Sequence, residues 1–364
     1  MPRLRLLIAV LAPVLVAVAC GGGGSGGATG PQRQGQPRPF LMGVSSVPRI
    51  PTDDAYKEAF QLAGKAGDLV LVQRAPPWDE FVPGGTVSDR TQRLTRLERD
   101  LAKKYGLKLF LAVDATDPQD RGRLAGLPDD LRGADFSDGR VRSAFISYAK
   151  YLALNYKPAY MALGVEVDMY FNRRGDAAFR TFQSLYFQAY DAVKSVSPST
   201  QVFPTFQYED MQALLAVGST IAQPAWSLVN RFVPKIDALA VSSFPGFVYG
   251  SPDKVPGDYF DQLKARFQLP LIIASTGWAS GPAAPDAVSG ESDQAAFLTS
   301  TLTAAERLGA SVVVWYLGRD VEPPVSEGFQ PLATSGLLRA DGSAKLAWAV
   351  WRTYAERPVA ATGN

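Results

Sequence analysis

The sequence of 364 residues contains no histidine at all. This absence excludes Ser-His-Asp and Cys-His catalysis, imidazole metal ligands and a histidine general base. Any acid–base chemistry in this protein must therefore be carried by aspartate and glutamate, with lysine or tyrosine as less suitable groups.

Cysteine is almost as rare, because Cys20 is the only one in the chain. A single cysteine excludes an intramolecular disulfide and a thiolate metal cluster. Only a cation that prefers oxygen ligands, such as calcium, would remain possible. The acidic stretches 52–54 and 114–120 are more simply explained as a helix cap and a solvated loop. We therefore predict neither a metal nor a cofactor.

Neither sign of charge is in large excess, because the formal net charge is +2. This balance favours neither nucleic acid nor an acidic polymer as a partner. Hydrophobic residues make up 46% of the chain, which is enough to build a large core.

The first twenty residues have the pattern of an export signal. Arg3 and Arg5 precede an apolar stretch, 6–19, that is shorter than the roughly 20 residues of a membrane span. The letters "AVAC" that end at Cys20 resemble the bacterial lipobox, with Ala17 where leucine is commoner. The resemblance implies cleavage before Cys20 and lipid attachment to its thiol. We expect a lipid-anchored, extracytoplasmic protein of the bacterial cell envelope, attached to the membrane through Cys20.

Residues 20–39 are rich in glycine and proline and show no apolar periodicity. Such a stretch cannot bury enough surface to order itself, so it is interpreted as a tether. A phosphate-binding loop would need a strand before the glycines and a helix after them, and neither is present. The predicted organisation is a signal peptide at 1–19, a lipidated tether at 20–39, one domain at 40–357 and a tail at 358–364.

Eight short apolar segments recur along the predicted domain. Continuous apolar strands of this length are typical of parallel strands that are covered on both faces. The predicted strands are 40–46, 68–74, 107–114, 160–166, 201–207, 236–244, 270–275 and 311–317.

A segment with helical periodicity follows each predicted strand. The predicted helices are 52–67, a helix capped by Ser88, and 140–155, 177–196, 209–231, 258–267, 293–308 and 344–356. Eight strand–helix pairs favour a single (β/α)8 barrel of the α/β class, and a doubly wound open sheet is the competing architecture. In a barrel, functional residues lie where the strands end.

Acids, amides and large aromatics follow the predicted strand ends. Such a combination suits carbohydrate, because sugar hydroxyls need polar partners and sugar C–H faces stack on aromatic rings. The candidate substrate-binding residues are Trp78, Asp114, Gln207, Tyr208, Phe244, Trp278 and Trp315. The alternative is that the aromatic side chains only plug the top of the barrel.

Several of these strand-end segments together resemble a known family. "YMALGVEVDMY", "VSSFPGF", "PLIIASTGW" and "VVVWYLGRD" are similar to segments of clan A glycoside hydrolases, nearest to bacterial endo-galactanase-like members. The resemblance covers nearly the whole domain and is best from about residue 160 onward. It implies a (β/α)8 barrel with an acid/base glutamate after strand four and a nucleophilic glutamate after strand seven.

Glu166 matches the first of these glutamates, although Val165 stands where the family usually has asparagine. Ser275 occupies the second position. Retaining hydrolysis needs two carboxyl groups about 5–5.5 Å apart, and serine without histidine replaces neither the charge nor the nucleophile. We therefore expect retaining hydrolysis to be lost.

Three hypotheses for the function remain open. In the first, the barrel binds an oligo- or polysaccharide without cutting it. In the second, Glu166 is the acid of an active hydrolase and Asp320 or Glu209, with Asp114 third, is a base about 6.5–9.5 Å away. In the third, the barrel is a non-carbohydrate scaffold of the envelope. A monomer is expected in each case.

Overall fold

A computed structural model describes residues 35–215, 224–281, 289–325 and 329–360. Cys20 and the predicted signal peptide lie outside these ranges. Within the described ranges, no helix has the length and apolar character needed to cross a membrane. Arg38 and Val359 form an isolated β-bridge, so the structure continues a few residues past both ends of the predicted domain.

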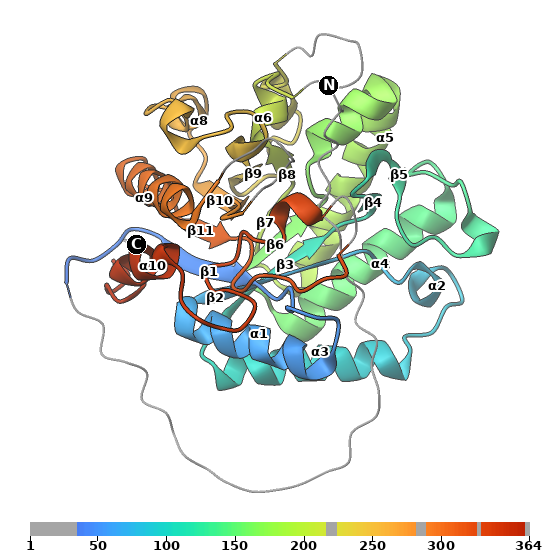
Figure 1. The fold of residues 1–364 in the computed structure, drawn as a ribbon. Helices are drawn as coiled ribbons and strands as arrows, with labels where there is room; N and C mark the ends of the chain where they lie inside the picture. Colours follow the sequence, from blue (N-terminus) through green and yellow to red (C-terminus); the bar gives the residue numbers. More distant parts are fainter. Residues whose placement is uncertain (1–34, 216–223, 282–288, 326–328, 361–364) are drawn as a thin grey trace, which may run out of the picture.

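The strands form one closed, parallel sheet (Figure 1). They are β1 (Leu41–Ser45), β2 (Leu69–Arg74), β3 (Lys108–Val113), β6 (Tyr160–Leu163), β7 (Gln201–Phe203), β8 (Thr205–Gln207), β9 (Leu239–Ser243), β10 (Leu271–Thr276) and β11 (Val312–Trp315). Their order is β7-β6-β3-β2-β1-β11-β10-β9-β8.

The closure of the sheet rests on the predicted fifth strand. Pro204 divides this strand into β7 and β8, since proline cannot donate a backbone hydrogen bond to a ladder. β7 pairs with β6 and β8 pairs with β9, so the fifth strand joins both edges of the sheet. β1 also pairs with β11. The predicted (β/α)8 barrel is confirmed, and the open sheet is not.

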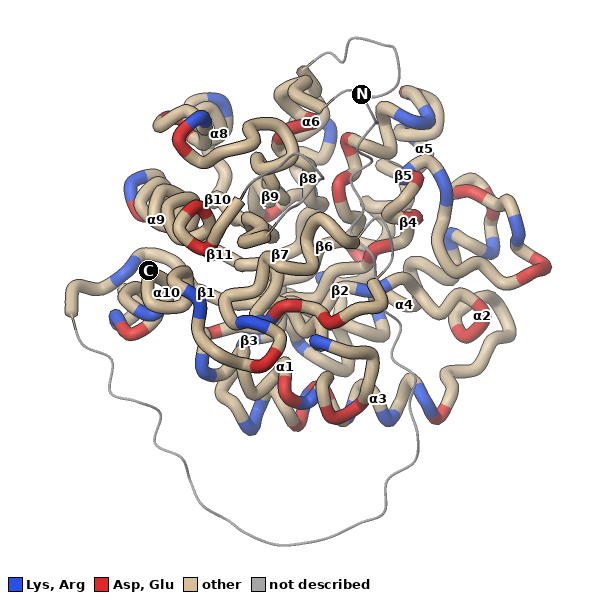
Figure 2. The backbone as a smooth tube through the Cα atoms, in the orientation of Figure 1, with Lys and Arg blue, Asp and Glu red and all other residues tan. Residues whose placement is uncertain are grey.

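Helices surround the barrel on all sides of the view (Figure 1). They are α1 (Asp53–Ala66), α2 (Trp78–Phe81), α3 (Asp89–Lys104), α4 (Gly139–Tyr156), α5 (Val167–Val196), α6 (Tyr208–Met211), α7 (Ser227–Asn230), α8 (Asp261–Arg266), α9 (Glu291–Arg307) and α10 (Leu346–Ala355). Lysine, arginine, aspartate and glutamate alternate along α1 and α3 (Figure 2).

The predicted caps are present where polar side chains precede a helix. The side chain of Thr52 accepts a hydrogen bond from the backbone N–H of Ala55 at the start of α1. Ser88 does the same for Thr91 at the start of α3. Each of these bonds satisfies a backbone donor that has no partner within the helix.

Two helices differ from the prediction. Helix α5 begins at Val167 instead of residue 177, and Gly175, with φ 75°, interrupts it. A short helical segment therefore directly follows the strand end that carries Glu166. The predicted helix 209–231 is two short helices, α6 and α7, and residues 216–223 between them lie outside the described ranges.

A hairpin between β3 and α4 was not predicted. Its antiparallel strands are β4 (Thr116–Asp117) and β5 (Asp120–Leu124). Asp117 Oδ1 accepts a hydrogen bond from the backbone N–H of Gln119 at 2.8 Å and fixes the turn. The hairpin brings Arg121 back over the carboxyl end of β3.

Candidate functional site

Glu166 lies at the carboxyl end of β6, where the family resemblance places the acid/base glutamate. Its backbone is left-handed, with φ 52° and ψ 51°, and its N–H donates to Thr205 Oγ1 at 3.0 Å. A left-handed conformation costs a non-glycine residue about 1–3 kcal/mol and is found more often at functional sites than elsewhere. Only 1% of Glu166 is exposed.

Arg121 connects Glu166 to Asp114. Its Nη2 donates to Glu166 Oε2 at 2.9 Å, and its Nη1 donates to Asp114 Oδ1 at 2.5 Å. Gln73 Nε2 donates to the other oxygen of Asp114 at 2.8 Å. All three charged side chains are almost completely buried. We call Asp114, Arg121 and Glu166 the central triad.

The pKa values in the central triad follow from burial and from charge pairing. Burial raises the pKa of Asp114, although Arg121 opposes this shift. Burial alone would lower the pKa of Arg121, but the carboxylates of Asp114 and Glu166 raise it above its usual value. Arg121 is therefore a permanent cation between two carboxylates.

The second oxygen of Glu166 is also occupied. Ser242 Oγ, at the end of β9, donates to Glu166 Oε1 at 2.6 Å. With Arg121 on Oε2, both carboxylate oxygens have protein donors. A general acid must deliver a proton to the leaving oxygen of a substrate, and Glu166 would have to do so from an oxygen that already accepts a hydrogen bond from Arg121 or Ser242.

Ser275 lies on β10, the strand next to the one that carries Ser242. In the pairing of β10 with β9, Ser275 is opposite Ser242. Its Oγ is buried and has no hydrogen-bond partner among the described residues. A cavity of about 10 Å³ has Gln73, Thr205, Ser242 and Ser275 in its lining. Ser242 therefore lies between the two predicted positions, bonded to Glu166 and paired with Ser275, and the residue at the end of β10 is a serine instead of a carboxylate.

Glu209 was a candidate base, and the structure surrounds it with neutral donors. Ser243 Oγ donates to its Oε1 at 2.7 Å and Tyr259 OH donates to the same oxygen at 2.6 Å. Gln207 Nε2 donates to its Oε2. Burial raises the pKa of Glu209, and the hydrogen bonds from Tyr259 and Ser243 oppose this shift.

Asp320, the other leading base candidate, forms an ion pair. Lys345 Nζ donates to Asp320 Oδ1 at 2.6 Å, and the backbone N–H of Gly336 donates to the same oxygen at 2.9 Å. Lys345 is almost fully buried and also donates to Ser280 and to the carbonyl of Thr334. Asp320 therefore joins loops beyond β11 instead of facing Glu166.

Two further acids form a buried pair near Glu166. Asp168 Oδ1 accepts the backbone N–H of Gln207 at 2.9 Å, and Asp210 Oδ2 accepts Asn172 Nδ2 at 2.6 Å. Their other oxygens, Asp168 Oδ2 and Asp210 Oδ1, are buried, and no other described residue donates a hydrogen bond to them. Burial and the charge of Asp210 raise the pKa of Asp168 well above its usual value, and burial raises that of Asp210 to about 6.

Neither acid of this pair is among the site residues predicted from the sequence. Asp168 stands two residues after Glu166, and Asp210 follows the fifth strand, so the strand-end rule was the only available signal. In the part of the chain that the structure describes, no group of three or more acidic side chains is arranged to hold a metal ion.

The aromatic side chains predicted to bind substrate are not accessible at the barrel mouth. All five aromatic candidates are buried with at most 3% exposure: Trp78, Tyr208, Phe244, Trp278 and Trp315. The indole N–H groups of the tryptophans donate to Ala125 O, Ser289 Oγ and Ser335 O respectively. This burial favours the alternative that these rings plug the top of the barrel. Gln207 is fully buried too, between Glu209 and the backbone of Asp210.

A cavity of about 680 Å³ opens instead at the ends of β1, β2 and β3. We call it the mouth cavity. Ser45, Gln73, Asp114 and Tyr316 line its inner side. Asp114 is the only predicted site residue on its wall, and it connects the cavity to the central triad.

Tyrosines line the outer side of the mouth cavity, and sequence reasoning missed them. They are Tyr56, Tyr148, Tyr151 and Tyr156. Three of them lie on α4, where their spacing is indistinguishable from that of core residues of an amphipathic helix.

A buried glutamate supports this wall. Glu98 on α3 accepts hydrogen bonds from Tyr56 OH, Tyr156 OH and Arg74 Nη2. Glu98 is fully buried, whereas about a fifth of the Arg74 side chain remains exposed, at 23%. The guanidinium of Arg74 is thus held in place on the wall of the cavity.

Comparisons with known proteins find similarity in the fold of this chain. No protein-family model and no curated protein matches the sequence. Among solved structures, an exo-β-1,4-mannosidase, Op5Man5, from Opitutaceae bacterium strain TAV5 is similar at 18% identity and TM-score 0.64, over 87% of this chain and 59% of that one. A GH5_18 protein from Bifidobacterium longum is similar at 15% identity and TM-score 0.66, over 88% of this chain and 81% of that one.

A β-glucuronidase from Ruminococcus gnavus is also similar, at 12% identity and TM-score 0.60, over 89% of this chain and 51% of that one. The chain therefore spans little more than half the length of the mannosidase and the glucuronidase. Identities this low establish the fold alone. The similar structures are glycoside hydrolases, and the fold that this chain shares with them is the (β/α)8 barrel expected from the sequence.

Proposed function

We propose that this protein is a cell-envelope lipoprotein whose barrel binds an oligo- or polysaccharide and no longer carries out retaining hydrolysis. One observation carries the proposal: Glu166 is enclosed by Arg121 and Ser242, and Ser275 stands where a second carboxylate would be needed. Retaining hydrolysis requires two carboxyl groups on either side of the glycosidic bond.

The hydrolytic alternative finds little support in the other acids. Glu209 is held by Ser243 and Tyr259, and Asp320 is held by Lys345. Asp114 does face the mouth cavity, but it shares Arg121 with Glu166. Each candidate base therefore has a structural partner that it would have to give up.

The mouth cavity supports carbohydrate binding. Its volume of about 680 Å³ lies within the roughly 300–1,000 Å³ that is usual for small-molecule sites. Tyr151 supplies a half-buried aromatic ring, and Gln73 and Arg74 supply partly exposed polar groups for hydroxyls. The cavity adjoins the strand ends where the similar enzymes of this fold carry their active sites.

The membrane anchor is part of the same proposal. The letters "AVAC" and the apolar stretch before Cys20 support lipid attachment, and the Gly- and Pro-rich tether at 20–39 would hold the barrel away from the membrane. The particular likeness to endo-galactanases stays a prediction from the sequence motifs.

Binding can be tested with a matched pair of tyrosine variants of the full-length protein. Tyr151 lines the mouth cavity, whereas Tyr105, another half-buried tyrosine, does not. We expect Tyr151→Ala to weaken binding to a responsive polysaccharide by about fivefold or more, since one stacked ring contributes roughly 1 kcal/mol or more. Tyr105→Ala is expected to leave the affinity unchanged.

The measurement is an affinity titration over plant, fungal and bacterial polysaccharides. If none of them binds, the carbohydrate proposal is refuted and the scaffold hypothesis takes its place. Equal losses in both variants would show that the mouth cavity is not the binding site.

A further inference from the structure

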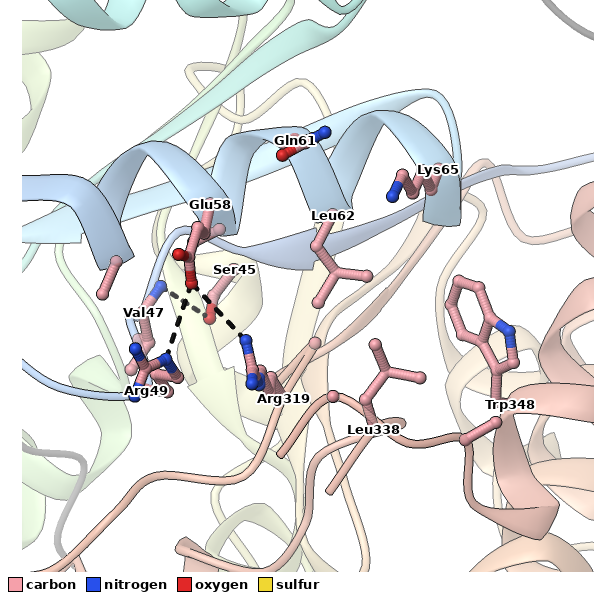
Figure 3. A pocket seen from close by; sticks show the side chains of 15 residues that line it. Ser45, Val47, Arg49, Glu58, Gln61, Leu62, Lys65, Arg319, Leu338 and Trp348 are labelled. Atoms are coloured by element: carbon pink, nitrogen blue, oxygen red, sulfur yellow. Dashed lines mark hydrogen bonds and ion pairs between the residues drawn. The ribbon is translucent and has the colours of Figure 1, made fainter. Parts of the chain in front are cut away.

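A second cavity lies on the other side of the β1 end from the mouth cavity. It has a volume of about 470 Å³ and lies between α1 and the loops that follow β11 (Figure 3). Ser45 and Val47 line both cavities and form the wall that they share. We call the second cavity the lateral pocket.

The lateral pocket carries an excess of positive charge. Its charged lining residues are Arg49, Lys65 and Arg319 against Glu58 alone. Glu322 pairs with Arg49 at 2.6 Å from outside the lining. Three cations against two anions still leave one positive charge at the pocket.

The two guanidinium groups are not fully satisfied by these acids. Glu58 Oε2 lies 3.5 Å from Arg49 Nε and 3.4 Å from Arg319 Nη1, and Figure 3 shows it between them. These distances are long for charge-assisted hydrogen bonds, which are usually about 2.7–2.9 Å. The side chains of Arg49 and Arg319 are 26% and 24% exposed, so parts of both remain accessible. Their weakly paired positive charge favours an additional oxyanion in the pocket.

The rest of the lining is apolar. Leu62, Leu338 and Trp348 face the pocket opposite the arginines (Figure 3). An inorganic anion would leave this apolar wall unused, whereas a sugar ring has C–H faces that can lie against it. Gly342 leaves space for the Arg319 guanidinium, because a Cβ there would lie only 3.3 Å from its Nη2.

We infer that the lateral pocket binds a sugar acid, whose carboxylate is held by Arg49 and Arg319 and whose ring lies on the apolar wall. Its position next to the mouth cavity would let an acidic glycan occupy both sites across Ser45 and Val47. The inference goes beyond the proposed function, because a free monosaccharide acid is sufficient to occupy the pocket.

The test is isothermal titration of the full-length protein with D-glucuronate and, separately, with D-glucose, which lacks the carboxylate. We expect millimolar or tighter binding of glucuronate and at least about tenfold weaker binding of glucose. Arg319→Gln should weaken glucuronate binding by about tenfold or more. Glu58→Gln should strengthen it, because Glu58 competes for the same guanidinium groups. If Arg319 and Glu58 had only a structural role, their two variants would not change the affinity for glucuronate in opposite directions.

Arg180→Gln is the control, because it removes an exposed arginine on α5 outside both cavities. It is expected to leave the affinity for glucuronate unchanged. The inference is overturned if glucose binds as well as glucuronate, if Arg319→Gln has no effect, or if inorganic phosphate binds as tightly as glucuronate. A protein that binds glucuronate but no polysaccharide would refute the proposed function and leave this inference intact.

Discussion

Arg121 is the residue that neutralises the polar interior at the barrel mouth. It is buried between Asp114 and Glu166, and it reaches them from a hairpin that the strand pattern did not predict. Removing one partner of a buried ion pair leaves an uncompensated charge, which usually costs about 3–5 kcal/mol.

We therefore expect Arg121→Met to lower the free energy of unfolding by about 3–5 kcal/mol, as measured by urea denaturation. Adding Glu166→Gln to this variant should recover part of the loss, because one buried negative charge is removed. Arg123→Met, at an exposed position of the same hairpin, should change the value by less than about 0.5 kcal/mol. A small effect of Arg121→Met would contradict the central triad as described.

Ser275 occupies the position where the family resemblance implies the second carboxylate. Its Oγ is buried without a partner, so Ser275→Ala should be neutral or stabilise the protein by about 1 kcal/mol. The adjoining cavity of about 10 Å³ cannot accept a glutamate side chain. Ser275→Glu should therefore destabilise the protein by about 1–3 kcal/mol or more without creating hydrolysis. Thermal unfolding and product release measured on the two variants check both expectations.

The acid pair makes stability depend on pH. Asp210 has a pKa of about 6 in the folded protein against about 3.9 in an unfolded chain. Between these values the folded state holds a proton that the unfolded state has released, so the free energy of unfolding falls as the pH rises from about 4 to about 6. Asp210→Asn should reduce this pH-dependent decrease in the free energy of unfolding by about 3 kcal/mol.

The measurement for this prediction is the melting temperature at several pH values between 4 and 7. Asp176→Asn is the control, since a hydrogen bond from Arg231 lowers the pKa of Asp176 and its titration lies below this window. An unchanged pH slope in Asp210→Asn would show that the acid pair does not titrate as described.

At the scale of secondary structure, one strand depends on a glycine. A Cβ at Gly43 in β1 would lie 2.4 Å from the carbonyl oxygen of Leu69 in β2, so the two strands could not keep their spacing. Gly43→Ala is expected to destabilise the protein by about 1–3 kcal/mol or more in urea denaturation. Gly139→Ala, where an added Cβ meets nothing within 4 Å, should be nearly neutral. Equal effects of the two substitutions would refute the argument from close packing.

The strands and helices predicted well from the sequence are those with a clear hydrophobic pattern or a polar helix cap. Strands β2 and β3 are continuous apolar runs, and α1 and α3 have polar caps at Thr52 and Ser88, so local signals agreed with the tertiary structure. The β4–β5 hairpin has no apolar alternation that would reveal it. The start of α5 was missed because the segment 167–174 is separated from the rest of the helix by Gly175.

At the scale of the whole molecule, the order of the elements was sufficient to predict the barrel, and Glu166 and Ser275 lie near the ends of β6 and β10. The strand-end rule could not predict exposure. Trp278 and Trp315 follow strands, as sugar-binding aromatics would, but helix packing buries them. The mouth cavity depends on Tyr148 and Tyr151, whose orientation is set by the packing of α4 against its neighbours and not by local sequence.

The central claim is that this barrel binds carbohydrate without cutting it. The most direct test measures binding and the release of reducing ends on the same samples, for the wild-type protein and for Glu166→Gln. The account predicts saturable binding by the wild type and no detectable release of reducing ends from either protein. Release by the wild type that Glu166→Gln abolishes would contradict it and would show that the barrel is an active hydrolase.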